Sequence, residues 1–166
     1  MGTVDPIVTV AKIQIAPQQL ELWKSGVLPA RWAQHYPFLF DDLDLAQTCT
    51  QPSAHYVEWL GAILLHHATG FHALVEKYEF RKAHPRKQII VERLIGGALL
   101  DLVRDMKKGA QCPDLLMYSP DFSDWFFCEV KGPTDRMRPV QLALFTQLAT
   151  LSGKPVRLLR FTHSQW

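Results

Sequence analysis

Residues 113–131 read PDLLMYSPDFSDWFFCEVK. Two runs rich in apolar and aromatic residues, Asp114–Tyr118 and Trp125–Lys131, are separated by a turn-forming segment of Ser, Pro and Asp, which predicts two strands. If these strands pair as a hairpin, Asp114 at the start of the first lies near Glu129 toward the end of the second.

The hairpin would gather charged side chains at one edge of a sheet. Side chains two positions apart on a strand share a face, so Glu129 and Lys131 point the same way and Val130 points away. The ionised carboxylates of Asp114 and Glu129 repel one another unless a cation lies between them, and oxygen ligands suit Mg²⁺ or Mn²⁺. Lys131 could orient or deprotonate a metal-bound water. The residue types alone also fit a surface salt-bridge cluster.

Helices and strands are predicted on both sides of this hairpin, which indicates a mixed α/β fold around a small sheet. Gly96-Gly97 inside one predicted helix indicates a close crossing or a break, because glycine destabilises a helix interior. The remaining predicted elements are a helix from a Ser53 cap to Gly70, a strand over 71–80, a helix over 86–108, a helix over 139–152 and a strand over 156–161.

The first part of the chain has a different pattern. We expect residues 1–52 to form an N-terminal accessory segment and residues 53–166 to form the main domain. Residues 8–15 alternate loosely, which predicts a short strand, and Pro17 is a plausible helix start. The aromatic, proline-punctuated stretch 29–40 is expected to pack against the main domain or a partner.

Composition excludes several classes of protein. The chain has 166 residues, 48% of them hydrophobic and 20% charged, which suits one folded domain and excludes a disordered chain. No apolar run approaches the roughly 20 residues of a membrane helix, and the first residues lack a signal-peptide pattern. Cys49, Cys112 and Cys128 lack C-x-x-C spacing, which argues against a disulfide framework or a zinc ribbon. We therefore expect a cytoplasmic protein that does not bind a membrane.

The small net charge of +2 is unevenly distributed. Residues 53–166 carry fifteen basic and eleven acidic side chains, whereas residues 1–52 carry three basic and five acidic ones. Basic clusters of this kind fit a phosphate backbone, although each one alone also fits a solvated surface.

The segment Pro113-Asp114-Leu115 and residues 128–141, CEVKGPTDRMRPVQ, together resemble the VRR-NUC family. That family belongs to the PD-(D/E)xK nuclease superfamily and includes the nuclease domain of Fanconi-associated nuclease. The resemblance covers residues 53–161 and is dense only over 113–141. It implies a restriction-endonuclease-like core, with the helix over 86–108 inserted before the motif strands.

The resemblance also implies roles for individual residues. Asp114, Glu129 and the backbone carbonyl of Val130 would bind the metal, and Lys131 would lie by the attacking water. Gln141 would lie near the scissile phosphate, although it also fits an exposed glutamine at a helix start.

Residues after the motif match the family less well. Arg136 and Arg138 would contact the nucleic-acid backbone, but family members often carry Ser at the position of Arg138. The family's tryptophan three residues after the glutamine is Leu144 here. These departures concern substrate contacts more than the metal site.

The superfamily usually adds a carboxylate from its first helix, and two residues compete for that role. Glu58 lies on a predicted helix directly before a strand, which is the expected order. Glu92 lies on the helix that more closely precedes Asp114. We favour Glu58, while either residue also fits an ordinary surface glutamate.

These features predict a Mg²⁺- or Mn²⁺-dependent nuclease that hydrolyses phosphodiester bonds in DNA. The expected setting is either the processing of branched, flapped or nicked DNA, in some cases as a homodimer, or an antibacterial toxin that is secreted into target cells and blocked by an immunity protein. The alternative is a non-catalytic DNA-binding module of the same fold, although a degenerate site usually loses one of its catalytic residues.

Overall fold

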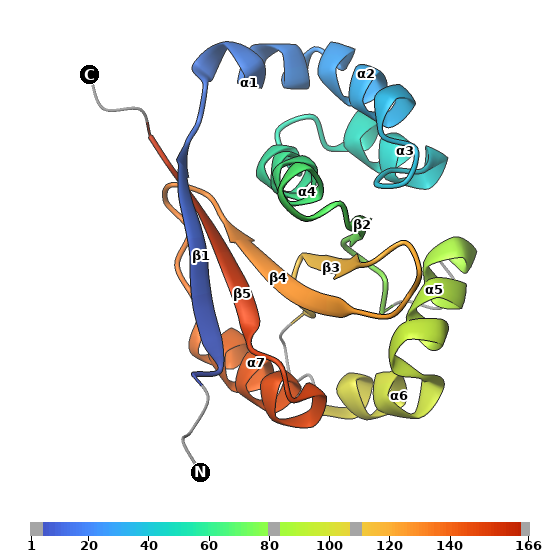
Figure 1. Ribbon diagram of the computed structural model, residues 1–166. Coiled ribbons are helices and arrows are strands. Elements are labelled where there is room, and N and C mark those ends of the chain that lie inside the picture. The colour runs from blue at the N-terminus through green and yellow to red at the C-terminus, as the bar shows by residue number, and fades with distance from the viewer. Residues whose placement is uncertain (1–4, 80–83, 107–110, 164–166) are drawn as a thin grey trace.

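The centre of the fold is a five-stranded mixed sheet in the order β1-β5-β4-β3-β2 (Figure 1). The computed structural model describes residues 5–79, 84–106 and 111–163. Strands β1, β5 and β4 are parallel neighbours, whereas β3 is antiparallel to both β4 and β2. The strands are β1 (Ile7–Gln14), β2 (His72–Val75), β3 (Leu115–Tyr118), β4 (Trp125–Lys131) and β5 (Val156–Thr162).

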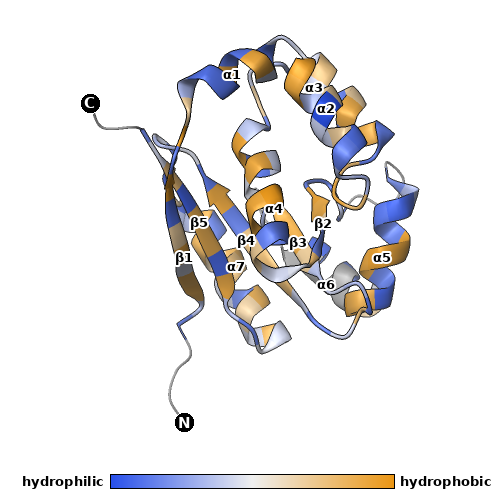
Figure 2. Ribbon diagram, turned by 45° about the horizontal axis from the view of Figure 1, so that its top comes forward, coloured by the Kyte–Doolittle hydropathy of each residue, from blue (hydrophilic) through white to orange (hydrophobic). Residues whose placement is uncertain are grey.

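Helices cover both faces of the sheet (Figure 1). One face carries α1 (Pro17–Lys24), α2 (Val27–His35), α3 (Asp42–Thr50) and α4 (Tyr56–Thr69), and the other carries α5 (Pro85–Ile95), α6 (Gly97–Met106) and α7 (Pro139–Ser152). Much of α4 consists of hydrophobic residues, and this helix lies between the sheet and the outer helices (Figure 2). Among the described residues, no helix combines the length and the apolar character that crossing a bilayer requires. The prediction of an α/β fold with a small mixed sheet flanked by helices is confirmed, and the restriction-endonuclease-like core stays a prediction.

The predicted hairpin is present as β3 and β4. Leu115 pairs with Cys128, which leaves Asp114 opposite Glu129 at the end of the ladder. Alternation along β4 buries Cys128 and Val130 against the α4 side and Phe127 against the α7 side.

The N-terminal residues share this core. β1 pairs in parallel with β5 as an edge strand, and the Trp23 and Phe40 side chains are both 2% exposed. The Phe40 ring stacks on the Trp59 ring of α4, with centroids 3.7 Å apart. The division into an accessory segment over 1–52 and a domain over 53–166 stays a prediction.

Three local predictions differ from the structure. The strand expected over 71–80 ends at Val75, because Glu76 and Lys77 both have φ of 52°, which is incompatible with a strand. The helix expected over 86–108 is divided between α5 and α6 at Gly96, whose φ is 81°. The helix expected to begin at a Ser53 cap begins at Tyr56 without a side-chain cap.

A buried lysine holds the chain where β2 ends. Lys87 of α5 is fully buried, and its Nζ donates hydrogen bonds to Asp44 Oδ1 at 2.6 Å, to the carbonyl of Val75 and to the carbonyl of Glu76 at 2.9 Å. One ammonium group therefore joins α3, α5 and the turn after β2. An ammonium group has three N–H donors, and here each donor has one acceptor, so the hydrogen-bonding capacity of the buried Lys87 Nζ is fully used.

Replacing Lys87 by Met should lower the free energy of unfolding by about 3–5 kcal/mol, because the change leaves the carboxylate of Asp44 buried without its counterion. Urea unfolding followed by circular dichroism measures the loss. Lys24→Met is the matched control, since Lys24 forms an exposed pair with Glu21, and it should change stability by less than about 1 kcal/mol. A similar small change in Lys87→Met would contradict this account.

Candidate metal centre

Acidic side chains from several segments meet at one end of the sheet. Glu58 lies in the first turn of α4, Glu76 directly after β2, and Asp114 directly before β3. Each of these three residues offers a carboxylate oxygen, and the three oxygens lie within 4.8 Å of one another. We refer to Glu58, Glu76 and Asp114 as the carboxylate cluster.

Backbone hydrogen bonds fix the position of the cluster relative to Glu129 of β4. The Asp114 N–H donates to Glu129 Oε2 at 3.1 Å, and the Val130 N–H donates to Asp114 Oδ2 at 2.9 Å. The Glu76 N–H donates to the Asp114 carbonyl at 2.7 Å. The structure thus brings Asp114 and Glu129 together, as expected from the predicted hairpin. Each of the two carboxylates accepts a hydrogen bond from a backbone N–H.

Glu129 belongs to a second group of polar side chains, which we name the Glu129 triad: Glu129, Lys131 and Gln141. The Lys131 Nζ lies 2.9 Å from Glu129 Oε1 and donates to Gln141 Oε1 at 3.1 Å, and Gln141 Nε2 donates to Glu129 Oε1 at 3.2 Å. Glu129 and Lys131 are only 3% and 6% exposed. Gln141 reaches them from the first turn of α7, where its Oε1 also accepts the N–H of Arg138.

Crowding of negative charge changes the protonation of the carboxylate cluster. Burial, followed by the charge of Glu76, raises the pKa of Glu58 to about 7. Burial, followed by the charges of Glu129 and Glu58, raises the pKa of Asp114 well above its usual value. Carboxylic acids so close together cannot all ionise without a compensating cation.

The cluster meets the requirements of a divalent cation site. The Oε2 atom of Glu58 is buried and has no hydrogen-bond partner among the described residues, which is costly unless another group binds it. Several carboxylate oxygens from different segments form the donor set that hard divalent cations prefer. The carboxylate cluster therefore fits a divalent metal ion.

The sequence patterns do not identify Glu76 as a site residue. It has φ of 52°, and its Oε2 lies 2.6 Å from Nδ1 of His55, the residue before α4. Burial of His55 opposes its protonation, but the hydrogen bond and charge of Glu76 outweigh burial and raise the His55 pKa. The only sequence signal for Glu76 is its position near the end of a strand, because a left-handed turn at a non-glycine residue leaves no motif.

The other predicted site residues lie outside the cluster. Glu92 is exposed on α5 and accepts a hydrogen bond from Gln88, so of the two competing glutamates only Glu58 joins Asp114. Arg136 and Arg138 are exposed on the segment that joins β4 to α7. Val130 donates its N–H to Asp114, and the metal-binding role of its carbonyl stays a prediction.

Comparisons with known proteins find similarity at the level of solved structures. No family model and no curated protein match this chain, so the resemblance to VRR-NUC rests on the motif residues alone. A crystal structure of paFAN1 bound to DNA with a two-nucleotide 5′ flap and a gap is similar, with a TM-score of 0.40 and 21% sequence identity. The similarity covers 50% of this chain and 16% of the paFAN1 chain.

The raised pKa of Glu58 predicts how stability depends on pH in the absence of metal. Between the usual value of 4.5 and about 7, the unfolded chain ionises Glu58 while the folded chain keeps the proton. The unfolded state therefore binds fewer protons, and stability falls as pH rises through this window. In EDTA, the melting temperature should fall less steeply from pH 5 to pH 8 in Glu58→Gln than in the wild type.

Glu92→Gln serves as the control for this measurement, because the exposed Glu92 side chain lies outside the cluster. Its melting temperature should follow the wild-type curve across the same pH range. Parallel curves for Glu58→Gln and the wild type would show that Glu58 does not retain a proton in the folded state.

Proposed function

We propose that this protein hydrolyses phosphodiester bonds in DNA with the help of Mg²⁺ or Mn²⁺. The observation that carries the proposal is the convergence of the carboxylate cluster, with its raised pKa values and the unpartnered Glu58 Oε2, beside the Glu129 triad. Buried acids whose pKa values are displaced by specific neighbours are frequent at functional sites. A buried lysine within the same network adds a group that can act on water or on a phosphate oxygen.

In this proposal the carboxylate cluster holds the cation, and Glu129 and the Val130 carbonyl complete its protein ligands. When bound, the cation supplies Lewis-acid activation of the phosphate and lowers the pKa of a bound water. Each carboxylate oxygen has two lone pairs, so Glu129 can keep its bonds to Lys131 and Gln141 while it binds a metal.

Lys131 and Gln141 act on the reacting groups in this scheme. The Lys131 ammonium is held by Glu129 Oε1 and Gln141 Oε1, so its remaining N–H can orient a water molecule or hold a phosphate oxygen. Gln141 is fixed by both partners and by the Arg138 N–H, which keeps its amide rigid beside the scissile phosphate. Both residues thus stabilise charge that develops in the transition state.

DNA is the proposed substrate because of the VRR-NUC resemblance over residues 113–141. Arg136 and Arg138 are exposed directly before the helix that carries Gln141 and could contact the phosphate backbone. The proposal covers two settings, a cytoplasmic enzyme that processes branched, flapped or nicked DNA, with or without dimerisation, and a secreted toxin that an immunity protein blocks.

Asp114→Asn and Glu129→Gln should each reduce cleavage by at least about 100-fold, because each removes a negative charge from the metal ligands without changing side-chain shape. The assay compares plasmid, flap and junction DNA with Mg²⁺, with Mn²⁺ and in EDTA. Asp124→Asn provides the matched control, since Asp124 forms an exposed pair with Lys154 in a turn, and it should cleave like the wild type.

Two results of this assay would refute the proposal. One is undiminished cleavage in EDTA, and the other is robust cleavage by the combined Asp114→Asn, Glu129→Gln variant. Tight DNA binding without cleavage under every metal condition would instead favour a non-catalytic DNA-binding module.

A further inference from the structure

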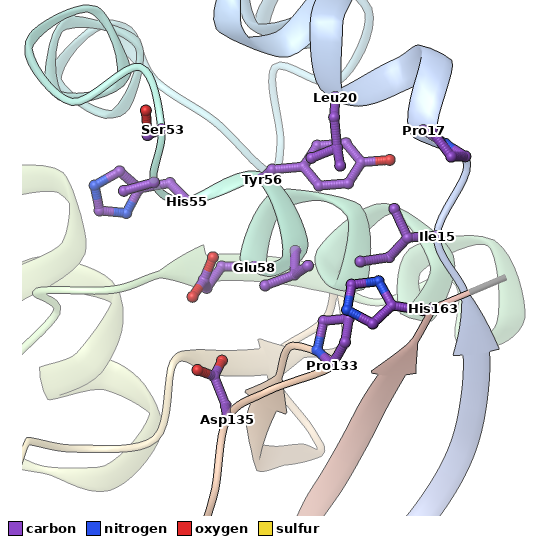
Figure 3. Close-up of a pocket in the computed structure, with 12 residues that line it drawn as sticks. Ile15, Pro17, Leu20, Ser53, His55, Tyr56, Glu58, Pro133, Asp135 and His163 are labelled. Carbon is purple, nitrogen blue, oxygen red and sulfur yellow. The ribbon is translucent and has the colours of Figure 1, made fainter.

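A pocket of about 500 Å³ is lined by Glu58 of the carboxylate cluster (Figure 3). Residues 53–58, which span the end of the preceding loop and the first turn of α4, form one side, and the start of α1, the 133–135 turn and His163 form the others. Glu58 lines the pocket and also belongs to the carboxylate cluster, so the two sites are continuous. The volume falls within the range of about 300–1,000 Å³ that is typical of small-molecule sites.

The walls of the pocket are apolar on one side and polar on the other. Ile15, Leu20 and the Tyr56 ring lie at the apolar end, whereas Glu58 and Asp135 lie at the end near the cluster (Figure 3). No Lys or Arg is among the described residues that line it. The carboxylates of Glu58 and Asp135 and the imidazoles of His55 and His163 are polar groups in an otherwise largely apolar lining, so the pocket suits a group with apolar faces and a polar edge.

The apolar wall is formed before any ligand binds. Tyr56 donates its hydroxyl proton to Gln19 Oε1 at 2.8 Å, and its ring packs against Trp23 and Trp32 with centroids 5.8 Å and 6.1 Å away. A wall that is already fixed loses little conformational freedom when a ligand enters. Such rigidity favours binding of a flat, rigid group.

We propose that this pocket binds the base of an unpaired nucleotide next to the phosphodiester bond that is cleaved. The inference rests on the proposed function and narrows its substrate class. A nucleobase is neutral and planar, with apolar faces and a hydrogen-bonding edge, and its own backbone phosphate would lie toward the carboxylate cluster. A base inside a duplex cannot enter such a pocket without leaving the stack, which is least costly when the base is already unpaired.

The pocket can be tested by changing the substrate and the protein together. Each unpaired nucleotide flanking the mapped cleavage position of a flap or gapped DNA is replaced, one at a time, by an abasic nucleotide. At one position the loss of the base should lower kcat/KM of the wild type about tenfold, which is the scale of a single bound base. Replacement at the other positions should change kcat/KM by less than about twofold.

Ala54→Trp supplies the protein side of the test, because Ala54 is exposed at the rim and a large side chain there would fill the pocket. On the intact DNA, kcat/KM of this variant should be about tenfold lower than that of the wild type. On the abasic DNA, its kcat/KM should equal its own value on the intact DNA. Ala68→Trp is the matched control, since Ala68 is exposed in the last turn of α4 and does not line the pocket. It should retain the wild-type discrimination, and thermal melting verifies that both variants fold.

The possible failures are distinguishable. A wild type that cleaves flap DNA equally well with a base or an abasic nucleotide at every position would overturn the pocket inference and leave the nuclease proposal intact. An Ala54→Trp variant that discriminates like the wild type would also overturn the pocket inference alone. A wild type that cleaves no DNA with either Mg²⁺ or Mn²⁺ would overturn both proposals.

Discussion

Repulsion between half-buried carboxylates is the constraint on which the rest of this structure depends. Glu58, Glu76 and Asp114 come from three segments that are distant in sequence, yet their oxygens lie within 4.8 Å of one another. Such a cluster opposes folding, and the surrounding contacts hold it in place. The Glu76 N–H binds the Asp114 carbonyl, His55 pairs with the Glu76 carboxylate, and Lys87 holds the carbonyls of Val75 and Glu76. The carboxylate cluster therefore lowers the stability of the folded protein, as is common for groups that bind a ligand or a metal.

The N-terminal helices contribute to this geometry although they carry none of the cluster. Trp23 and Phe40 pack on Trp59, which fixes α4 and with it the turn that carries Glu58. Asp44 of α3 is the counterion of Lys87, so a chain of contacts runs from α3 through α5 to Glu76. Of these helices, α1 also lines the apolar end of the pocket, through Pro17 and Leu20. The first fifty residues thus shape both the carboxylate cluster and the pocket beside it.

The β3–β4 hairpin and the shared face of Glu129 and Lys131 could be predicted from the sequence, because they depend on the local alternation of side chains along a strand. Gln141 is expected near this site only from the VRR-NUC resemblance, since no local rule places the first turn of α7 beside β4. Glu76 and Lys87 could not be predicted, since their roles depend on a left-handed turn and on burial across several elements. The parallel pairing of β1 with β5 joins segments about 150 residues apart, and no local pattern specifies such pairing. The choice of Glu58 over Glu92 from element order agrees with its position beside Asp114, whereas the catalytic role of each residue stays a prediction.

The most direct measurement of the central claim is diffraction from crystals soaked in Mn²⁺, recorded at the manganese absorption edge. An anomalous peak should lie between the carboxylates of Glu58, Glu76 and Asp114, and Glu58 Oε2 should be among the atoms that contact it. Manganese bound elsewhere, with no peak inside the carboxylate cluster at a concentration that supports cleavage, would contradict the account.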